Sequence, residues 1–600
     1  MDQELYQFIN SRITTPEAVD GDKIMDLATA VTKFVKPGMS IQTGNSMAFP
    51  SAIYYEIARQ FWGKEPNFTL IGNTGGSFSF ALFAFGKLCN RIISGFNGDG
   101  YPFPAPNPML TRAFKNGDVI PESWTFLTLA QRLMAGAMGL PFFPTKSISG
   151  SSMEDENKAA FKKASNPFNP QESVGLLKAL NPDIALAHGW AADENGNTIL
   201  GLPYTFNHYG ALAARKGVIV TVEKIVDADF IRRHSYLTRL PGHVVKAVCP
   251  VPFGGHPIGL HALGLPEFEG YGEDEEFTLE ARKASKDEDD YQKWIDKWVL
   301  GCKDHGEFIS RLGQRRVWFL MGRIHKNSWK SELAEAAPRL IHPKTPTPAE
   351  RLVIGAAEKL TDIVKKNGHK LLLCGIGVSN LASWMAYFDL RRQNVLLELL
   401  AEIGFYGYAP QPADPFLFNL RNLPSSRMTS DISTTLGIFM CGFQSASIGV
   451  LGAGQIDRFG NVNTTKVTAD GPYLVGSGGA NDVASGASEV MITMDQNKKR
   501  FVEKVPYITS PGTKVTTVAT QNGIFEKPIG HHELELSVYF ENPAHGSEQE
   551  TIAAISAQCA WPLKIREPLK ILPTPTDEQI KFLRCFDPKR LFLGGPESKR

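Results

Sequence analysis

The sequence predicts an α/β protein built from two related open α/β domains, and three observations support this prediction. Short continuous apolar runs, such as residues 184–187 and 489–494, are typical of strands buried on both faces of a mostly parallel sheet. The segments between such runs, for example residues 126–138, have the pattern of helices. Residues 193–197 and 457–461 share the turn signal Asp-X-X-Gly-Asn, and two distant copies indicate a duplicated domain.

The elements of each half follow the same order along the chain. Residues 38–46 and residues 371–379 each predict a short apolar strand that runs into a glycine turn and then into a helix. Residues 217–222 predict a further buried strand in the first half. In the second half, Pro348 opens a helix that is followed by a strand at residues 370–374.

A change in composition divides the 600-residue chain into three segments. Residues 1–267 form the first predicted α/β domain and residues 349–600 the second. Between them, residues 268–348 are dense in Glu, Asp and Lys and end in a proline-rich stretch, which predicts a charged helical insertion and a linker. We interpret the charge run as a solvated helical face rather than as an interaction surface.

The composition excludes several classes of function. The formal net charge is +1, so no nucleic-acid partner is implied. No apolar run approaches the ~20 residues needed to cross a bilayer, and the N-terminus lacks a signal-peptide pattern, so we expect a cytoplasmic protein without a membrane partner. The seven cysteines are scattered without a Cys-X-X-Cys pair, which supports neither a disulfide framework nor a zinc cluster.

The segment Glu402-Ile403-Gly404-Phe405-Tyr406-Gly407 carries the strongest chemical signal. It follows an apolar run, so it predicts a buried strand that ends in a loop, which is where α/β folds expose reactive groups. Glu402 is therefore the candidate nucleophile. The alternative reading is a surface carboxylate in a turn. The nearby Glu398 competes less well, because it lies inside the apolar run with no glycine beside it.

Residues 476–482, Gly-Ser-Gly-Gly-Ala-Asn-Asp, form a glycine cluster that follows the strand-like residues 473–475. Its backbone amides are suited to binding an oxyanion, but the same residues fit a tight turn, and the sequence leaves both readings open. The phosphate-binding, zinc-protease and serine-hydrolase motifs are absent. His256, His531 and His532 lack partners at ligand spacing, so we predict structural roles for them and no metal site.

Several segments resemble the glutaconate type of family I coenzyme A transferases. The second half is similar to the β subunit of that family, because residues 402–407 match its Glu-X-Gly-X-X-Gly nucleophile segment. The first half is similar to the α subunit. The other matching segments are residues 457–465, 476–482 and 501–512 in the second half and residues 129–147, 182–197 and 251–257 in the first.

The resemblance implies a fusion of α-subunit-like and β-subunit-like halves with a pseudo-twofold relation and an active site where they meet. Glu402, expected to be ionised at neutral pH, would attack the thioester of an acyl-CoA to give a glutamyl anhydride and then a glutamyl-CoA thioester. The amides of Gly478, Gly479 and Ala480 would stabilise the oxyanions or bind CoA. The pocket would be lined by Gly44, Asn45, Ser46, Thr145, Lys146, Gly404 and Phe405.

The implied partners are an acyl-CoA and a carboxylic acid, with coenzyme A as a substrate rather than a bound cofactor. The identity of the acids is not implied, and association into a homo-oligomer stays open. One alternative on the same fold is a hydrolase or decarboxylase of CoA thioesters. A second alternative is a non-catalytic acyl-CoA-binding or assembly protein, against which the retention of Glu402 and of the glycine cluster argues.

Overall fold

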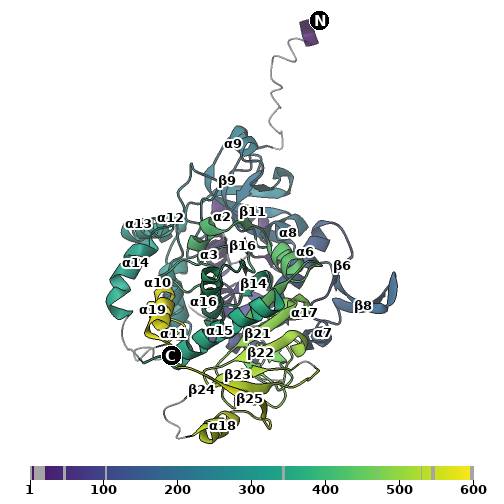
Figure 1. Ribbon diagram of the computed structural model, residues 1–600. Coiled ribbons are helices and arrows are strands. Elements are labelled where there is room, and N and C mark those ends of the chain that lie inside the picture. The colour runs from purple at the N-terminus through teal and green to yellow at the C-terminus, as the bar shows by residue number, and fades with distance from the viewer. Residues whose placement is uncertain are drawn as a thin grey trace.

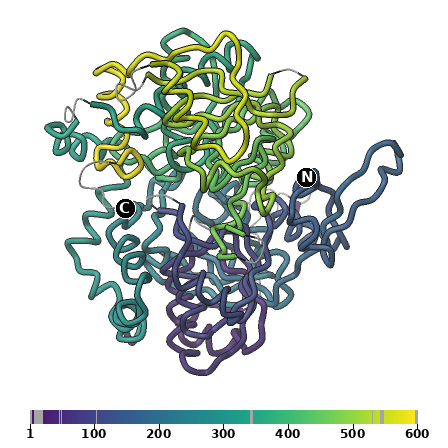
Figure 2. The backbone as a smooth tube through the Cα atoms, turned by 90° about the horizontal axis from the view of Figure 1, so that it is seen from below, coloured from purple at the N-terminus to yellow at the C-terminus, as the bar shows by residue number. Residues whose placement is uncertain are grey.

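The computed structural model shows two α/β halves with a helical insertion beside them (Figure 1). The structure describes residues 3–5, 21–44, 47, 49–101, 104–340, 345–468, 471–528, 530–541 and 547–594. Figure 2 shows the first half, in purple to blue, facing the second half, in green to yellow, with the insertion in teal at one side.

A mostly parallel sheet forms the centre of the first half. Seven mutually parallel strands lie in the order β13-β11-β9-β1-β2-β3-β5, and the short strands β10, β12 and β4 continue it. Every residue of β9 is buried, as expected of a central strand covered on both faces. The strands are β1 (Ser40–Gln42), β2 (Phe68–Gly75), β3 (Cys89–Asp99), β4 (Ala105–Pro106), β5 (Ile120–Ser123), β9 (Ile184–Ala192), β10 (Thr198–Leu200), β11 (Val218–Ile225), β12 (Thr238–Leu240) and β13 (Val245–Pro250).

Helices cover this sheet, and a small antiparallel sheet of order β6-β8-β7 projects from it (Figure 1). The helices are α2 (Leu27–Phe34), α3 (Ser51–Phe61), α4 (Phe80–Phe85), α5 (Pro108–Asn116), α6 (Phe126–Ala137), α7 (Ser152–Glu156), α8 (Asn207–Ala213) and α9 (Ala228–Arg233), with a short 3₁₀ turn η1 (Gly242–Val244). The small sheet comprises β6 (Phe142–Thr145), β7 (Phe161–Asn166) and β8 (Asn169–Lys178).

The insertion is helical and packs on the first half. Trp294 and Trp298 are buried against Phe277 and Phe308, in the same apolar cluster as α2, α3 and α4. The helices are α10 (Glu275–Ala284), α11 (Glu288–Ile295), η2 (Asp296–Leu300), α12 (His305–Leu312), α13 (Gln314–Arg323), α14 (Trp329–Ala336) and η3 (Ala337–Arg339). The linker predicted before Pro348 lies partly outside the described residues, at 341–344.

The second half repeats the plan with a ten-stranded sheet. Its parallel core has the order β15-β14-β18-β21-β22. The antiparallel strands β16 and β17 extend it on one side, and β23, β24 and β25 extend it on the other, where β25 pairs parallel with β24. The strands are β14 (Leu371–Cys374), β15 (Glu398–Ala401), β16 (Phe405–Tyr406), β17 (Met428–Thr429), β18 (Ser447–Gly452), β21 (Glu489–Thr493), β22 (Val515–Ala519), β23 (Gly523–Glu526), β24 (Glu535–Phe540) and β25 (Lys564–Leu572), with a separate pair β19 (Gln455–Ile456) and β20 (Val462–Asn463).

Two long helices, α15 and α16, pack against each other and against this sheet, and the C-terminal helix α19 packs on both of them. The apolar core continues between the halves, where Phe126 and Leu133 of α6 share a cluster with Leu400 and Val483. The helices are α15 (Pro348–Asn367), α16 (Val378–Arg392), η4 (Leu420–Ser425), η5 (Ser433–Met440), α17 (Ala480–Gly486), η6 (Gly512–Lys514), α18 (Glu548–Ser556) and α19 (Asp577–Phe586).

The repeated Asp-X-X-Gly-Asn turns have the same hydrogen bonds in both halves. In the first half Asp193 accepts from the amide and side chain of Asn197, and Asn197 accepts from the Gly242 amide. In the second half Asp457 and Asn461 make the same pair of bonds, and Asn461 accepts from the Gly512 amide.

A partly buried lysine completes each turn in the same way. The Lys23 ammonium donates to the Gly242 carbonyl, and the Lys527 ammonium donates to the Gly512 carbonyl. The same set of contacts in two places is the structural mark of duplication, as the two copies of the motif predict.

The predicted fold class is confirmed, with one correction to a local element. Residues 473–475 are not a strand, because Tyr473 makes an isolated bridge to Lys466 and the Val475 carbonyl accepts from Asn97 in the other half. The segment therefore ties the halves together. Within the described residues, no helix combines the length and the apolarity that spanning a bilayer requires.

One ion pair at the C-terminus predicts a large effect on stability. Arg584 of α19 pairs with Glu350 of α15 through bonds of 2.6 and 3.1 Å, and both side chains are buried. Arg584→Leu leaves the Glu350 carboxylate buried without its partner, so we expect a loss of about 3–5 kcal/mol of unfolding free energy in urea titrations. Arg566→Leu, which breaks a 3.4 Å exposed pair with Glu526, should cost less than about 1 kcal/mol. Equal midpoints for the two variants would contradict this account.

Candidate active site

Glu402 stands at the carboxyl end of β15, in the loop predicted from sequence. Leu399 and Leu400 are fully buried in the sheet, and the strand ends directly before Glu402. Gly404 then turns the chain with φ = 125°, where a Cβ atom would lie 2.4 Å from the Ser430 carbonyl oxygen. The short strand and the glycine turn leave the Glu402 side chain partly exposed at the wall of a pocket.

This pocket has a volume of about 480 Å³ and is shared by all three segments of the chain. The first half contributes Phe49, Phe78 and Phe126, and the insertion contributes Glu275. The second half contributes Glu402 and the loops that follow β14, β18 and β21. Its position agrees with the rule that ligands bind beyond the carboxyl ends of strands in open α/β sheets.

The glycine cluster lies against Glu402, but only one of its three predicted amides points at the carboxylate. The Gly479 amide donates a hydrogen bond to Glu402. The Gly478 amide donates to the Gly95 carbonyl at 2.9 Å, and the Ala480 amide donates to Ser477 at 3.1 Å. All three residues line the pocket, yet the amides of Gly478 and Ala480 are already used to build the loop, which leaves Gly479 as the oxyanion donor suggested by the geometry.

The expectation that Glu402 is ionised at neutral pH is corrected by its surroundings. Burial in the pocket wall, together with the nearby negative charge of Asp482, raises the pKa of Glu402 to about 8, although the Gly479 amide acts in the opposite direction. With that pKa, about one Glu402 in ten is ionised at pH 7 in the empty pocket.

Asp482 was not singled out as a site residue, and it acts from behind the pocket wall. Its carboxylate accepts from the Thr125 hydroxyl at 2.5 Å and from the Leu127 amide at 3.1 Å, so it joins the start of α6 to α17 of the other half. Burial raises the pKa of Asp482 to about 7 in spite of these bonds. When it is ionised, the Asp482 carboxylate disfavours the ionisation of Glu402.

Of the remaining predicted pocket residues, those that the structure describes, namely Gly44, Thr145, Lys146, Gly404 and Phe405, lie outside the lining of this pocket. Phe405 is fully buried against Tyr408, because β16 returns along β15 and directs its ring into the core. Lys146 extends to the Cys441 carbonyl, and the Thr145 hydroxyl accepts from the Ser147 amide. Gly44 packs closely against the Pro50 ring, and Gly404 packs closely against the Ser430 backbone. The predicted residues Asn45 and Ser46 lie outside the described part of the chain.

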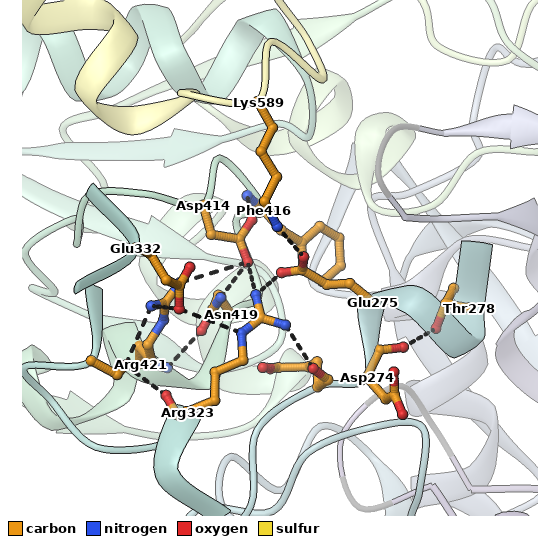
Figure 3. A network of polar contacts seen from close by, with 12 residues as sticks. Asp274, Glu275, Thr278, Arg323, Glu332, Asp414, Phe416, Asn419, Arg421 and Lys589 are labelled. Atoms are coloured by element: carbon orange, nitrogen blue, oxygen red, sulfur yellow. Dashed lines mark hydrogen bonds and ion pairs between the residues drawn. The ribbon is translucent and has the colours of Figure 1, made fainter. Parts of the chain in front are cut away.

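The insertion supplies site residues that the sequence interpretation missed. Glu273, Glu275 and Thr278 line the pocket, and Glu275 is only 8% exposed, so the charge run is not solely a solvated face. Asp414 and Phe416 of the second half lie beside them (Figure 3). A signal was present in the two tryptophans near this run, which indicate that one face of the insertion is buried.

The model of the coenzyme A transferase family matches residues 24–250 and 443–526, which include the repeated turns of both halves and the glycine cluster. The chain belongs to the coenzyme A transferase family. It is 29% identical to one subunit of the glutaconate CoA-transferase of Acidaminococcus fermentans, over 49% of this chain and 93% of that protein. It is 28% identical to one subunit of the 3-oxoadipate CoA-transferase of Pseudomonas knackmussii, over 41% of this chain and 96% of that protein.

Two further comparisons concern proteins that are longer than the single subunits above. An uncharacterised protein of Archaeoglobus fulgidus is 30% identical over 51% of this chain, and the match covers 65% of that protein, just under two thirds of its length. An acyl-CoA transferase of Escherichia coli O157:H7, solved as a thioester complex with CoA, matches 94% of this chain with a TM-score of 0.65 at 14% identity, which shows a shared fold. This coenzyme A transferase is therefore an enzyme of two fused subunit-like halves, as predicted.

The coupled carboxyls predict a pH dependence for the coenzyme A transferase. If the ionised form of Glu402 reacts, kcat/KM should rise about tenfold from pH 6 to pH 7 and level off above its pKa of about 8. Asp482→Asn removes the nearby negative charge, so the midpoint of the profile should fall by about one pH unit. Asp495→Asn, at another point of the pocket wall, should leave the midpoint unchanged. Identical profiles for wild type and Asp482→Asn would exclude this coupling.

Proposed function

We propose that this enzyme transfers CoA from an acyl-CoA to a free carboxylic acid, with Glu402 as the nucleophile. The observation that carries the proposal is the position of Glu402, which faces a pocket shared by both halves and accepts a hydrogen bond from the Gly479 amide. Relatives named as glutaconate and 3-oxoadipate CoA-transferases support the same chemistry.

The proposed reaction begins with attack of the Glu402 carboxylate on the thioester carbonyl. The C–S bond breaks, which gives an acyl-glutamyl anhydride and CoA thiolate. The thiolate then attacks the glutamyl carbonyl, so the donor acid leaves and a glutamyl-CoA thioester remains. Each tetrahedral intermediate carries an oxyanion, for which the Gly479 amide is the suggested donor.

The acceptor acid completes the cycle by the reverse sequence. Its carboxylate attacks the glutamyl thioester and releases CoA thiolate, which then attacks the acyl carbonyl of the new mixed anhydride. The new acyl-CoA leaves and the Glu402 carboxylate is regenerated. In this proposal coenzyme A is a substrate, and no step requires a metal or a bound cofactor.

The pKa of Glu402 fits this reaction. A carboxylate held in an apolar wall loses part of its hydration, so its negative charge is more favourably transferred to a thioester carbonyl than in water. The hydrolase or decarboxylase alternative has no specific contact in its favour among the described residues.

Trapping the covalent intermediate tests the proposal. The enzyme is incubated with acetyl-CoA without an acceptor, treated with hydroxylamine or borohydride, digested and examined by mass spectrometry. We expect a hydroxamate or a reduced side chain on the peptide that contains Glu402, and no such product when free CoA replaces acetyl-CoA. An unmodified peptide, under conditions in which transfer to an acceptor is measured, would refute the covalent route.

A further inference from the structure

One end of the pocket is built by residues outside the segments that match the family model. Glu273, Glu275 and Thr278 of the insertion form one wall, and the loop with Asp414 and Phe416 forms another (Figure 3). The matched segments are residues 24–250 and 443–526, so these two walls, like Glu402, lie outside them.

Aromatic rings give this end an apolar surface. The Tyr101 and Phe416 rings meet edge to face at 5.2 Å, and Phe418 packs on Phe416 at 5.6 Å. Two further rings of the lining, Phe49 and Phe78, meet edge to face at 5.8 Å. Rings that are fixed by such contacts form a rigid apolar site for a ligand.

Four carboxyl groups also line this end, namely those of Asp99, Glu273, Glu275 and Asp414. Arg323, which pairs with Glu275 and Asp414, and Lys589, which pairs with Glu275, lie outside this lining (Figure 3). The lining of the aromatic end thus contains acidic side chains, and the cations that pair with two of them lie outside this lining.

Each of these carboxyl groups is held in place. Asp99 accepts from the Ser77 amide and hydroxyl and from the Asn107 side chain. Burial raises the pKa of Glu273, which accepts from the Leu420 amide at 2.9 Å. These bonds fix the carboxyl groups, so they cannot turn away from a negatively charged ligand.

The basic side chain in the described lining is Arg500, and it belongs to a different part of the wall. Arg500 donates to the Gly454 carbonyl and pairs with Asp495, beyond the ends of β18 and β21. The phosphates of CoA are favoured near Arg500 rather than beside the acidic side chains of the aromatic end. The aromatic end is therefore available to the acyl group.

We infer that the acyl group of the substrate has an uncharged hydrocarbon chain that ends in a hydroxyl group. The enzyme would therefore disfavour dicarboxylic acids. This inference rests on the proposed function. The rings pack against the hydrocarbon chain, and the terminal hydroxyl donates to one of the carboxyl oxygens. A terminal carboxylate would instead lie among acidic side chains with no basic side chain in the described lining of this end to pair with it, which disfavours it.

Equilibrium binding of three matched thioesters tests the inference independently of catalysis. Hexanoyl-CoA, 6-hydroxyhexanoyl-CoA and adipoyl-CoA have the same chain length and differ only in the terminal group. Their binding to the Glu402→Ala variant, which is expected not to turn them over, is measured by calorimetry. We expect 6-hydroxyhexanoyl-CoA to bind most tightly and adipoyl-CoA at least about tenfold more weakly. Equal or tighter binding of adipoyl-CoA overturns the inference. Equal binding of hexanoyl-CoA and 6-hydroxyhexanoyl-CoA contradicts the part of the inference that concerns the hydroxyl group.

Thr278 offers a substitution that reverses the preference. Its side chain is partly exposed in the pocket wall on α10, so Thr278→Arg places a cation at the aromatic end, and Thr278→Val is the matched control. We expect Thr278→Arg to strengthen adipoyl-CoA binding about tenfold relative to Thr278→Val and to leave free CoA unchanged. If Thr278→Arg strengthens the binding of free CoA and of all three thioesters alike, this end holds the nucleotide and the inference is wrong.

A kinetic experiment separates this inference from the proposed function. The wild-type enzyme is given the same three thioesters with acetate as acceptor, and the formation of acetyl-CoA is followed. Transfer from adipoyl-CoA at the highest kcat/KM contradicts the inference and supports the proposed function. The expected binding order without any transfer supports the inference and contradicts the proposed function.

Discussion

Replacing Glu402 by alanine is expected to lower kcat for CoA transfer by at least about 10⁴-fold, because the proposed mechanism forms its covalent intermediates on this side chain. The carboxylate stands at the seam of the two halves, and the Gly479 amide directs it toward the pocket. The effect is measured as the rate of new thioester formation from acetyl-CoA and a carboxylic acid. Binding of acyl-CoA should persist, because the pocket walls are unchanged.

The Glu402→Ala variant should remain folded, since it removes a carboxyl group whose pKa is raised by burial and creates no large cavity beside the pocket. Its urea midpoint is therefore expected to equal that of the wild type or to exceed it. Glu398→Ala is the matched control, because Glu398 begins the same strand and pairs with Arg427 at 2.8 Å outside the pocket lining. Transfer should change less than about threefold in that variant. A fully active Glu402→Ala enzyme would contradict the assignment of Glu402 as the nucleophile.

The position of Glu402 could be predicted because its causes are local. An apolar run predicts a buried strand, and glycine after the strand predicts a sharp turn, so both signals lie within a few residues of the carboxylate. The duplicated turns were predictable for the same reason, since Asp193 and Asp457 bond to amides of their own loops. Local rules therefore place strands, turns and the candidate nucleophile.

The properties of the site depend on residues that are far apart in sequence. Asp482 raises the pKa of Glu402, and its carboxylate is held by Thr125 of the other half. Whether the Gly478 amide is free depends on Gly95, which also lies in the other half. A sequence pattern gives no measure of such contacts, so the ionisation of Glu402 and the choice among three amides were beyond prediction.

The insertion shows the same limit at a larger scale. The charge run predicts helices, but the burial of Glu275 depends on Arg323, which lies in a later helix of the insertion, and on Lys589 of the second half (Figure 3). A buried charge is tolerated only when such a partner is present. The composition of one segment therefore cannot show which of its charges face solvent and which face the pocket.

Adding a single methyl group at Gly479 is expected to reduce kcat by about 10²–10³-fold. A Cβ atom there would lie 2.2 Å from Glu402 Oε2 and 3.2 Å from Leu436 Cδ1, so the carboxylate must move away from the amide that now directs it. The backbone of Gly479 has φ = −87°, which alanine adopts without strain, so the stability of the fold should change little. Gly452→Ala is the matched control, because it lines the same pocket and its Cβ atom would meet Ser379 at an ordinary 3.8 Å. The rate of hydroxylamine trapping at Glu402 should fall with kcat in Gly479→Ala and remain near wild type in Gly452→Ala, and equal rates in the two variants would show that the contact between Gly479 and Glu402 does not position the nucleophile.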